Sequence, residues 1–465
     1  MIVSFFQTIT RPIFGSFERE EYKKFLRLGL IFATILGTYW TIRVLKNVVF
    51  FKLVGASFVP FAKTASLITL FPLLIFYNKL LDRYPREKMF GILAVAYGSL
   101  FLVVSCLLLI TQAAPDVIAA RSGFAYFATQ FIGYSWYVVT ETFGSLVVAL
   151  FWAIASDITK PESAKKGFYF VTALGQIGSI IAPGLLSRLP GLLNLQTDAI
   201  ILFIAALFTF SLYISMNWFF AHTPKNLLES FNDVAVNEKE IEKENKPGFF
   251  EGLKILFTHK YLLGIFIVIS IFEIIATIFD LNFDLLVSAA HSGTALTKYI
   301  GDYAAMVNIV AFICLIAGIG NITRFLGVSV ALILMPIIIG CALFGFVSLH
   351  SLQFLFWLMV GSKAINYALN GPAMKQLYIP TSKDARFKAQ SWIETFGSRS
   401  AKGSGSIFNM TLQPLQSHFG EAVGRAKYIT FVSYIGFILV ACWFFVALFL
   451  GRTYNKAIKE KKIIC

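Results

Sequence analysis

The chain has 465 residues, of which 57% are hydrophobic and only 14% are charged, and it carries a formal net charge of +15. A soluble domain of average composition has about 25% charged residues. Apolar runs of about 20 residues, the length of a helix that crosses a bilayer, recur from one end of the sequence to the other. The composition therefore excludes an ordinary soluble protein and predicts an all-α polytopic membrane protein.

The first helix is expected to begin at Ser16, because serine is a common helix cap and acidic residues followed by basic ones come directly after it. The residues before Phe17 lack the basic, apolar and small-residue regions of a signal peptide, so no cleaved leader is expected. Twelve membrane spans are predicted. They cover residues 26–48, 57–78, 89–111, 124–156, 165–187, 198–220, 261–285, 297–318, 321–346, 351–378, 387–411 and 427–450.

The basic residues are distributed unevenly among the loops between these spans. With both termini placed in the cytoplasm, most of the 40 lysines and arginines fall in cytoplasmic segments. This asymmetry follows the positive-inside rule, so it accounts for the net charge without any binding of nucleic acid. The opposite loops hold only Lys52, Arg121, Arg188, Lys298, Arg425 and Lys427.

The longest polar stretch, residues 222–258, has mixed charge and little apolar surface to bury. Such a composition is typical of a linker, so it divides the chain into two halves of six spans each. The expected division is 1–25 as a cytoplasmic N-terminal segment, 26–221 as the first half, 222–258 as a cytoplasmic linker, 259–450 as the second half and 451–465 as a basic cytoplasmic tail.

A short internal repeat agrees with this division. Residues 159–167 follow the fourth predicted span and resemble residues 381–389, which follow the tenth. Both segments share a threonine, an acid, a lysine and a small residue at matching positions, and Gly175 matches Gly397 at the same spacing. Two parallel repeats of six helices are the plan of the major facilitator architecture.

Charged residues inside the predicted spans are the candidates for function, because each costs roughly 2.5–3.5 kcal/mol at the centre of a spanning helix. Two pairs of cations lie three residues apart, Arg43 with Lys46 and Arg399 with Lys402, and Glu394 is the acid nearest to the second pair in sequence. In this architecture the first, fourth, seventh and tenth spans line a central cavity. Cations from both halves suit a phosphate-bearing polyanion, since arginine grips phosphate bidentately and lysine acts as a point charge.

The alternative is that these charges pair between helices and only stabilise the bundle. Glu141 admits three roles: a proton-coupling carboxylate, an acceptor for a substrate base or ribose, or an ion-pair partner of Lys46 or Lys363, which is the role we favour without substrate. Asp280 and Asp284 admit the same roles. The candidate substrate-binding residues are Arg43, Lys46, Glu141, Asp280, Asp284, Lys363, Arg399 and Lys402.

The sequence holds no nucleophile–base set and no cluster of metal-ligand residues, so neither an enzyme nor a metal or other cofactor is expected. The five cysteines have no paired spacing and are expected to be buried free thiols. The glycines that follow Lys402 do not form a phosphate loop, because the lysine precedes them and no strand leads into them. Small residues there are expected to let two helices approach closely.

Four charged stretches resemble the ATP/ADP translocases of intracellular bacteria and plastids, and the similarity extends over nearly the whole chain. Residues 43–47 keep both cations of the family's R-D-T-K-D block but neither acid. Glu141 precedes residues 151–159, which resemble F-W-x-x-A-N-x-I-T, and residues 377–390 resemble the family's tenth span and next loop. Residues 397–406 are similar to R-x-G-K-S-G-G, whereas the seventh span lacks the Trp and Lys of the family's N-L-V-E-x-x-W-K.

The resemblance implies a nucleotide transporter that exchanges ATP for ADP by alternating access, in which Lys46, Glu141 and Lys402 occupy positions important for transport. It also implies a multi-pass protein of a bacterial inner membrane, with the lipid bilayer as its surroundings. Two other functions stay open: a proton-coupled importer of a nucleotide or another organic phosphate, and a membrane component that serves assembly without transport.

Overall fold

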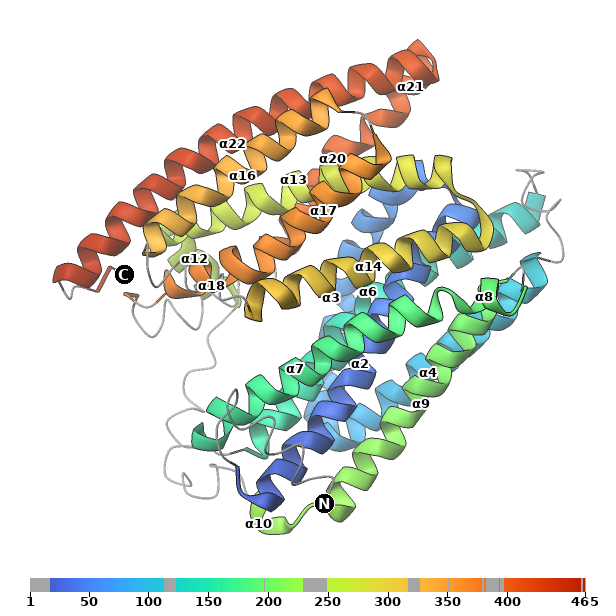
Figure 1. Cartoon of the computed structure of the whole chain (residues 1–465), viewed down its shortest axis with the longest axis vertical. Helices are drawn as coiled ribbons and strands as arrows, with labels where there is room; N and C mark the ends of the chain where they lie inside the picture. The colour runs from blue at the N-terminus through green and yellow to red at the C-terminus, as the bar shows by residue number, and fades with distance from the viewer. Residues whose placement is uncertain are drawn as a thin grey trace. The chain divides into compact units, whose positions relative to one another are not determined.

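A computed structural model describes residues 17–112, 123–159, 161–195, 197–228, 249–316, 327–349, 351–378, 380–381, 393, 397–460 and 463–464. These residues form helices and no strand (Figure 1). The helices are α2 (Arg19–Leu53), η1 (Ala56–Phe58), α3 (Val59–Arg83), α4 (Arg86–Gln112), α6 (Gly123–Asp157), α7 (Pro161–Leu186), α8 (Leu189–Leu192), α9 (Ala199–His222), α10 (Lys225–Leu228), α12 (Phe249–Thr258), α13 (Lys260–Ala290), α14 (Gly293–Ile316), α16 (Val328–Ser348), α17 (Leu352–Ile365), η3 (Asn366–Asn370), α18 (Gly371–Gln376), α20 (Ser398–Met410), α21 (Leu412–Phe419) and α22 (Glu421–Glu460).

Eight helices in the described part of the chain are long and apolar enough to cross a membrane, so the protein is a multi-pass membrane protein. They are α2, α4, α6, α7, α9, α13, α16 and α22, while the apolar stretches of α3 and α17 are shorter. The number of twelve spans stays a prediction. The expected helix start at Ser16, which lies outside the described residues, is wrong: Glu18 precedes α2, and its side chain makes no capping hydrogen bond.

The chain packs into two compact units. Unit 1 consists of Met1–Val54, Ile68–Glu244 and His291–Ala305, and unit 2 of Gly55–Leu67, Asn245–Ala290 and Met306–Cys465. Most of the predicted linker lies outside the described residues, and its two described ends are helical as α10 and α12. The first residues of α3, up to Leu67, belong to unit 2, and the first residues of α14, up to Ala305, belong to unit 1.

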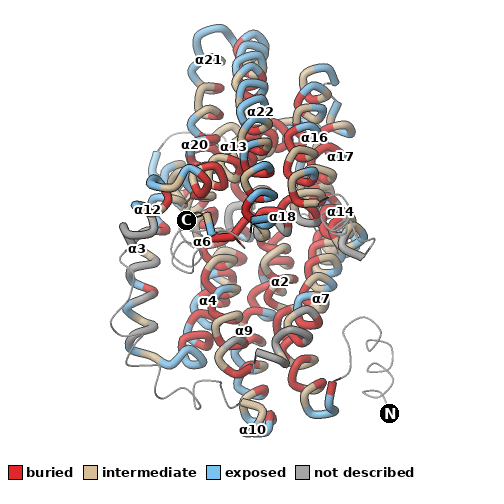
Figure 2. The backbone as a smooth tube through the Cα atoms, turned by 90° about the vertical axis from the view of Figure 1, so that its left-hand side faces the viewer, coloured by how far each residue is buried: buried red, intermediate tan, exposed pale blue. Residues whose placement is uncertain are grey.

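The central helix of unit 1 is α2, which packs against α7, α6 and α9, while α4 packs against α9 and α6. Figure 2 shows α2 buried over most of its length. Its apolar residues recur at spacings of three and four, which places them on the side of the helix that faces its neighbours. The buried residues of this stripe include Phe25, Leu28, Phe32, Ile35, Ile42, Leu45 and Val49.

Unit 2 repeats the same pattern of pairing around α13. This helix packs against α20, α17 and α22, and α16 packs against α22. The main helices of each half can be numbered 1 to 6 in chain order, as α2, α3, α4, α6, α7 and α9 in the first half and α13, α14, α16, α17, α20 and α22 in the second. In both halves helix 1 packs against helices 4, 5 and 6, and helix 3 packs against helix 6. Two repeats of one packing plan are what the major facilitator architecture requires.

Glycine allows the central helix of each unit to approach its main partner. A Cβ atom added to Gly178 of α7 would lie 2.2 Å from the backbone oxygen of Ala33 in α2. In unit 2, a Cβ atom on Gly405 of α20 would lie 2.9 Å from Cβ of Thr277 and 3.0 Å from the backbone oxygen of Ile274. The expectation that small residues after Lys402 allow a close helix approach is therefore confirmed.

The cysteines differ from the expectation. The four described cysteines have free thiols, but Cys106, Cys341 and Cys442 are exposed, not buried. The reason is that an apolar run in a membrane helix has one face against the protein and another against lipid. A cysteine in such a run therefore lies on either face, and hydropathy alone does not separate them.

Candidate functional site

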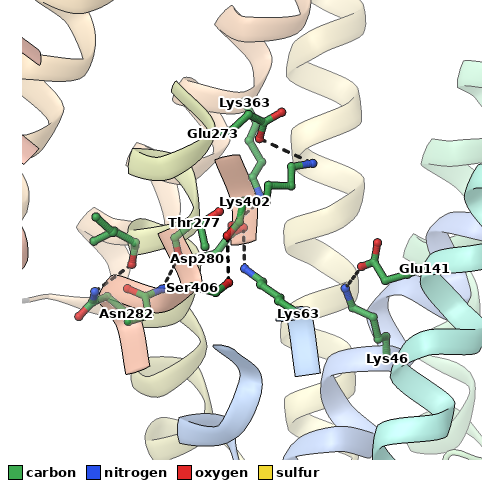
Figure 3. A network of polar contacts seen from close by, with 12 residues as sticks. Lys46, Lys63, Glu141, Glu273, Thr277, Asp280, Asn282, Lys363, Lys402 and Ser406 are labelled. Atoms are coloured by element: carbon green, nitrogen blue, oxygen red, sulfur yellow. Dashed lines mark hydrogen bonds and ion pairs between the residues drawn. The ribbon is translucent and has the colours of Figure 1, made fainter. Parts of the chain in front are cut away.

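The first group of charges lies within unit 1 and consists of Arg43 and Lys46 on α2 and Glu141 on α6, here named the α2 cluster. Lys46 Nζ lies 2.5 Å from Glu141 Oε1, as the dashed line in Figure 3 marks. The Lys46 side chain is 8% exposed, whereas that of Glu141 is 38% exposed. The lysine also lies 4.3 Å from the centre of the Tyr137 ring, so a carboxylate and an aromatic face both stabilise its charge.

Arg43 is held by aromatic rings of its own helix. Its guanidinium lies 4.7 Å from the ring centre of Trp40 and 6.0 Å from that of Tyr39. Residues three and four positions apart lie on one face of a helix, so sequence spacing alone brings these groups together. Tyr39 in turn packs over Gly144 of α6, where an added Cβ atom would lie 2.2 Å from the tyrosine ring. The cluster is thus positioned by close packing between α2 and α6.

The second group lies within unit 2 and is named the α13 cluster, with two carboxylates on α13 and three lysines from its neighbours. Asp280 Oδ1 lies 2.9 Å from Lys363 Nζ on α17, and Asp280 Oδ2 lies 3.5 Å from Lys63 Nζ on α3. All three side chains are between 17% and 29% exposed. One partly buried carboxylate therefore serves as counter-ion to two lysines from different helices.

The second carboxylate of the α13 cluster is Glu273, two helical turns before Asp280. Its Oε2 lies 3.6 Å from Lys402 Nζ on α20 (Figure 3). Its Oε1 accepts a hydrogen bond of 2.7 Å from Ser398 Oγ on the same helix. The Lys402 side chain is 53% exposed, so water screens this pair more than the Asp280 pairs. The five named side chains of the cluster are thus three lysines and two carboxylates.

A buried polar chain fixes α20 against α13 beside this cluster. Asn409 Nδ2 donates to the backbone oxygen of Thr277 at 2.9 Å, and the Tyr428 hydroxyl donates to Asn409 Oδ1 at 2.6 Å. Asn282 is also buried, and its Nδ2 donates to the backbone oxygen of Ile278 at 2.9 Å. Satisfied polar groups in a buried setting are directional, so they set the register in which Lys402 faces Glu273.

The eight candidate residues divide between the two units. The pairing of Glu141 with Lys46 is confirmed, while Lys363 pairs with Asp280. Arg399 lies half-buried on α20, and Asp284 is buried one turn after Asp280. Glu394, the expected acid beside Lys402, lies outside the described residues, and the carboxylate observed there is Glu273.

Lys63 and Glu273 also belong to the α13 cluster. Both are visible in the sequence as charges inside predicted spans, although neither was placed among the substrate-binding candidates. Within the described residues, no three His, Cys, Asp or Glu side chains lie close enough together to hold a metal ion. The clusters are instead cationic, which suits an anion with several oxygens.

Solved structures of membrane transporters have a similar backbone. A bacterial homologue of the iron transporter ferroportin, in an inward-facing state, has a TM-score of 0.63 and 13% identity over 93% of this chain and 98% of that chain. The nucleoside transporter NupG has a TM-score of 0.60 and 13% identity over 91% of this chain and 98% of that chain. The fold is therefore that of an all-α membrane protein with the major facilitator architecture, as the sequence predicts.

The sequence comparisons identify the family. The chain belongs to the TLC ATP/ADP transporter family, whose model matches residues 2–454. It is 25% identical to ADP,ATP carrier protein 1 of Rickettsia bellii (strain RML369-C), over 96% of each chain. It is 24% identical to the chloroplastic ADP,ATP carrier protein 2 of Arabidopsis thaliana, over 98% of this chain and 78% of that protein. The resemblance to ATP/ADP translocases is confirmed.

Proposed function

We propose that the protein is a nucleotide transporter that exchanges ATP for ADP across a membrane by alternating access. Membership of the TLC ATP/ADP transporter family supports this function, and so do the relatives named ADP,ATP carrier proteins. The observation that carries the proposal is the combination of this family with cations at membrane depth. Lys46 is held beside Glu141, and Lys363 is held beside Asp280.

The two clusters are proposed to bind the phosphates of the nucleotide. Without substrate, carboxylates neutralise most of the lysine charge and lower the cost of keeping it away from water. Among the named side chains, the α2 cluster has two cations and one carboxylate, and the α13 cluster has three lysines and two carboxylates. Phosphate oxygens compete with the carboxylates for the lysines, and Arg43 adds a planar donor for bidentate contacts.

When phosphate replaces a carboxylate as the partner of a lysine, nucleotide binding changes the ion pairs within each cluster. When phosphate takes Lys46, Glu141 becomes available as an acceptor for a ribose or base hydroxyl or amine. Asp280 keeps one lysine if phosphate takes the other, because its two oxygens contact different helices. Arg399, Lys402 and Asp284 complete the proposed set of binding residues, with Lys402 reaching substrate most easily because it is the most exposed lysine of its cluster.

Counter-exchange in liposomes tests this function directly. Reconstituted protein is expected to take up labelled ATP only when the liposomes contain ADP or ATP. The label is expected to remain in intact ATP, because a transporter does not convert its substrate chemically. Lys46→Gln is expected to lower uptake at least about tenfold at limiting ATP. Lys23→Gln is the matched control, since Lys23 is on the same helix and pairs with Glu20, an exposed residue outside the cluster.

Three outcomes would contradict the proposal. Transport of other organic phosphates without any nucleotide uptake would exclude a nucleotide substrate. Uptake that collapses with a protonophore, and that needs no internal nucleotide, would replace exchange by proton-coupled import. Lys46→Gln protein that is destabilised but binds ATP normally would assign the charges to assembly alone.

We further propose that the protein resides in a bacterial inner membrane with both termini in the cytoplasm and residues 222–258 as a cytoplasmic linker. The excess of basic residues in the segments on the side of the termini supports this topology. A protease site inserted in the linker is expected to be cut only when protease reaches the cytoplasmic side. Cleavage from the opposite side in intact cells would invert the assignment.

A further inference from the structure

Unit 2 contains a cavity of about 690 Å³ that is separate from both charge clusters. Its walls come from the C-terminal turns of α13 and α16 and the N-terminal turns of α17 and α22. These four helices pack against one another within the unit, as α16 and α22 do along their length in Figure 1. Its volume falls within the range of roughly 300–1,000 Å³ that is typical of sites for small amphipathic ligands.

Most of the residues that line the cavity are apolar, and Ser433 is a buried polar group among them. Phe346 and Leu355 are 7% and 2% exposed and form much of its inner wall. Ser433 also lines the cavity, is 5% exposed, and its hydroxyl has no hydrogen-bond partner within the described part of the protein. A hydroxyl at this position can donate to an acceptor atom of a molecule bound in the cavity.

Arg425 is the one cation among the described residues that line the cavity. Arg425 of α22 is half-buried and lines the cavity, and no described carboxylate lies within ion-pair distance of it. It precedes Ser433 by two helical turns, which is about 12 Å of helix rise. The arginine side chain covers part of this distance. The spacing thus suits a ligand with an anionic group at one end, an acceptor below it and a long apolar part.

The cavity opens toward a face of α22 that is apolar and exposed. Tyr434 and Phe437 line the cavity and are 71% and 41% exposed, and Ile438 and Phe445 continue the same face at 55% and 68%. On a membrane helix, such a face contacts lipid chains. We propose that the cavity binds an anionic phospholipid, with its phosphate at Arg425, an ester carbonyl accepting from Ser433 and an acyl chain against Phe346 and Leu355.

The test uses the full-length protein, delipidated in detergent and mixed with equal amounts of dioleoyl phosphatidylglycerol and dioleoyl phosphatidylcholine. Native mass spectrometry then counts the lipids that stay bound. The unaltered protein is expected to retain one phosphatidylglycerol with a preference of about tenfold over phosphatidylcholine. Arg425→Gln is expected to abolish the preference, and Ser433→Phe, which fills the cavity, is expected to abolish retention of both lipids.

Lys427→Gln is the matched control, because Lys427 is a neighbouring cation on α22 that does not line the cavity and lies over the Phe419 ring. It is expected to retain phosphatidylglycerol as the unaltered protein does. If Ser433→Phe does not fold, the preference of Arg425→Gln protein for phosphatidylglycerol over phosphatidylcholine still tests the proposal. The proposal is overturned if the unaltered protein retains no phosphatidylglycerol, if Arg425→Gln keeps the preference, or if millimolar inorganic phosphate displaces the lipid as readily as added phosphatidylglycerol does.

Discussion

Lys46 Nζ and Glu141 Oε1 lie 2.5 Å apart, yet the lysine side chain is 8% exposed and the glutamate side chain is 38% exposed. The two partners therefore depend on the ion pair to different degrees. Water reaches Glu141 in part, whereas Lys46 is nearly cut off from it. Removing the carboxylate leaves a buried charge, while removing the lysine leaves a carboxylate that water partly solvates.

The first prediction follows from this difference. Glu141→Gln is expected to lower the free energy of unfolding by about 2 kcal/mol, and Lys46→Gln by about 1 kcal/mol or less. The double variant is expected to lose less than the sum of the two. Thermal unfolding of the purified proteins in detergent measures all three. Equal losses for the two single variants would show that the exposure of the partners does not decide their effect.

Asp280 is expected to be the more important aspartate of α13 for transport. Asp280→Asn removes the counter-ion of both Lys63 and Lys363, so the two lysines repel each other and lose their positions. ATP exchange is expected to fall about tenfold, which corresponds to about 1.4 kcal/mol. Asp284→Asn, measured in the same liposome assay, is expected to reduce exchange less. A larger effect for Asp284→Asn would reverse the assignment.

A second-site change separates charge repulsion from loss of a specific carboxylate. Asp280→Asn is also expected to lower the Tm, and adding Lys63→Gln, which removes one of the two lysines, is expected to recover part of that loss. If the aspartate serves only as a hydrogen-bond acceptor, the second change will recover nothing.

Gly178→Ala is expected to disrupt the packing of α7 on α2. The added Cβ atom would lie 2.2 Å from the backbone oxygen of Ala33, and backbone atoms of a packed helix cannot move aside as a flexible side chain does. A loss of about 2 kcal/mol is expected, seen as a lower Tm and less monodisperse protein. Gly184→Ala on the same helix is the control, because its nearest atom would be the Ala305 Cβ at 3.4 Å. Similar losses in both variants would argue against the close approach.

Tyr428→Phe is expected to destabilise unit 2 by about 1–3 kcal/mol, because it leaves the buried Asn409 Oδ1 without the hydrogen bond from the Tyr428 hydroxyl. Tyr434→Phe is the control, since Tyr434 is 71% exposed on the same helix. Thermal unfolding is the measurement. A neutral Tyr428→Phe would mean that water or a neighbouring donor replaces the hydroxyl.

Much of the architecture is predictable from residue patterns. A run of about 20 apolar residues has few alternatives to a membrane helix, so the long helices were expected close to where they occur. Helix ends were less predictable: serine at position 16 is a good cap, but α2 begins three residues later, after Glu18. Propensity decides which residue can cap a helix, and packing decides which one does.

The candidate site was likewise predictable only in part from the sequence. Charges inside apolar runs can be read from the sequence, and the face shared by Arg43 and Lys46 follows from helical spacing. Their partners follow only in part: the sequence narrowed the partner of Glu141 to Lys46 or Lys363, and packing chose Lys46, which lies 95 residues away in the chain. The pairing of Asp280 with Lys63, 217 residues apart, was not predicted, because sequence alone does not say which helix faces meet.

Hydropathy, charge and repetition are properties of the amino-acid order, so they were enough to predict an all-α membrane protein built from two repeats with cations inside its spans. The packing of the helices was needed to show that Asp280 serves two lysines and that Glu273 faces Lys402. It was also needed to show that Arg425 and Ser433 line one cavity. Such relations depend on which helix faces meet, and side-chain volume and close helix approach fix those faces across the whole bundle.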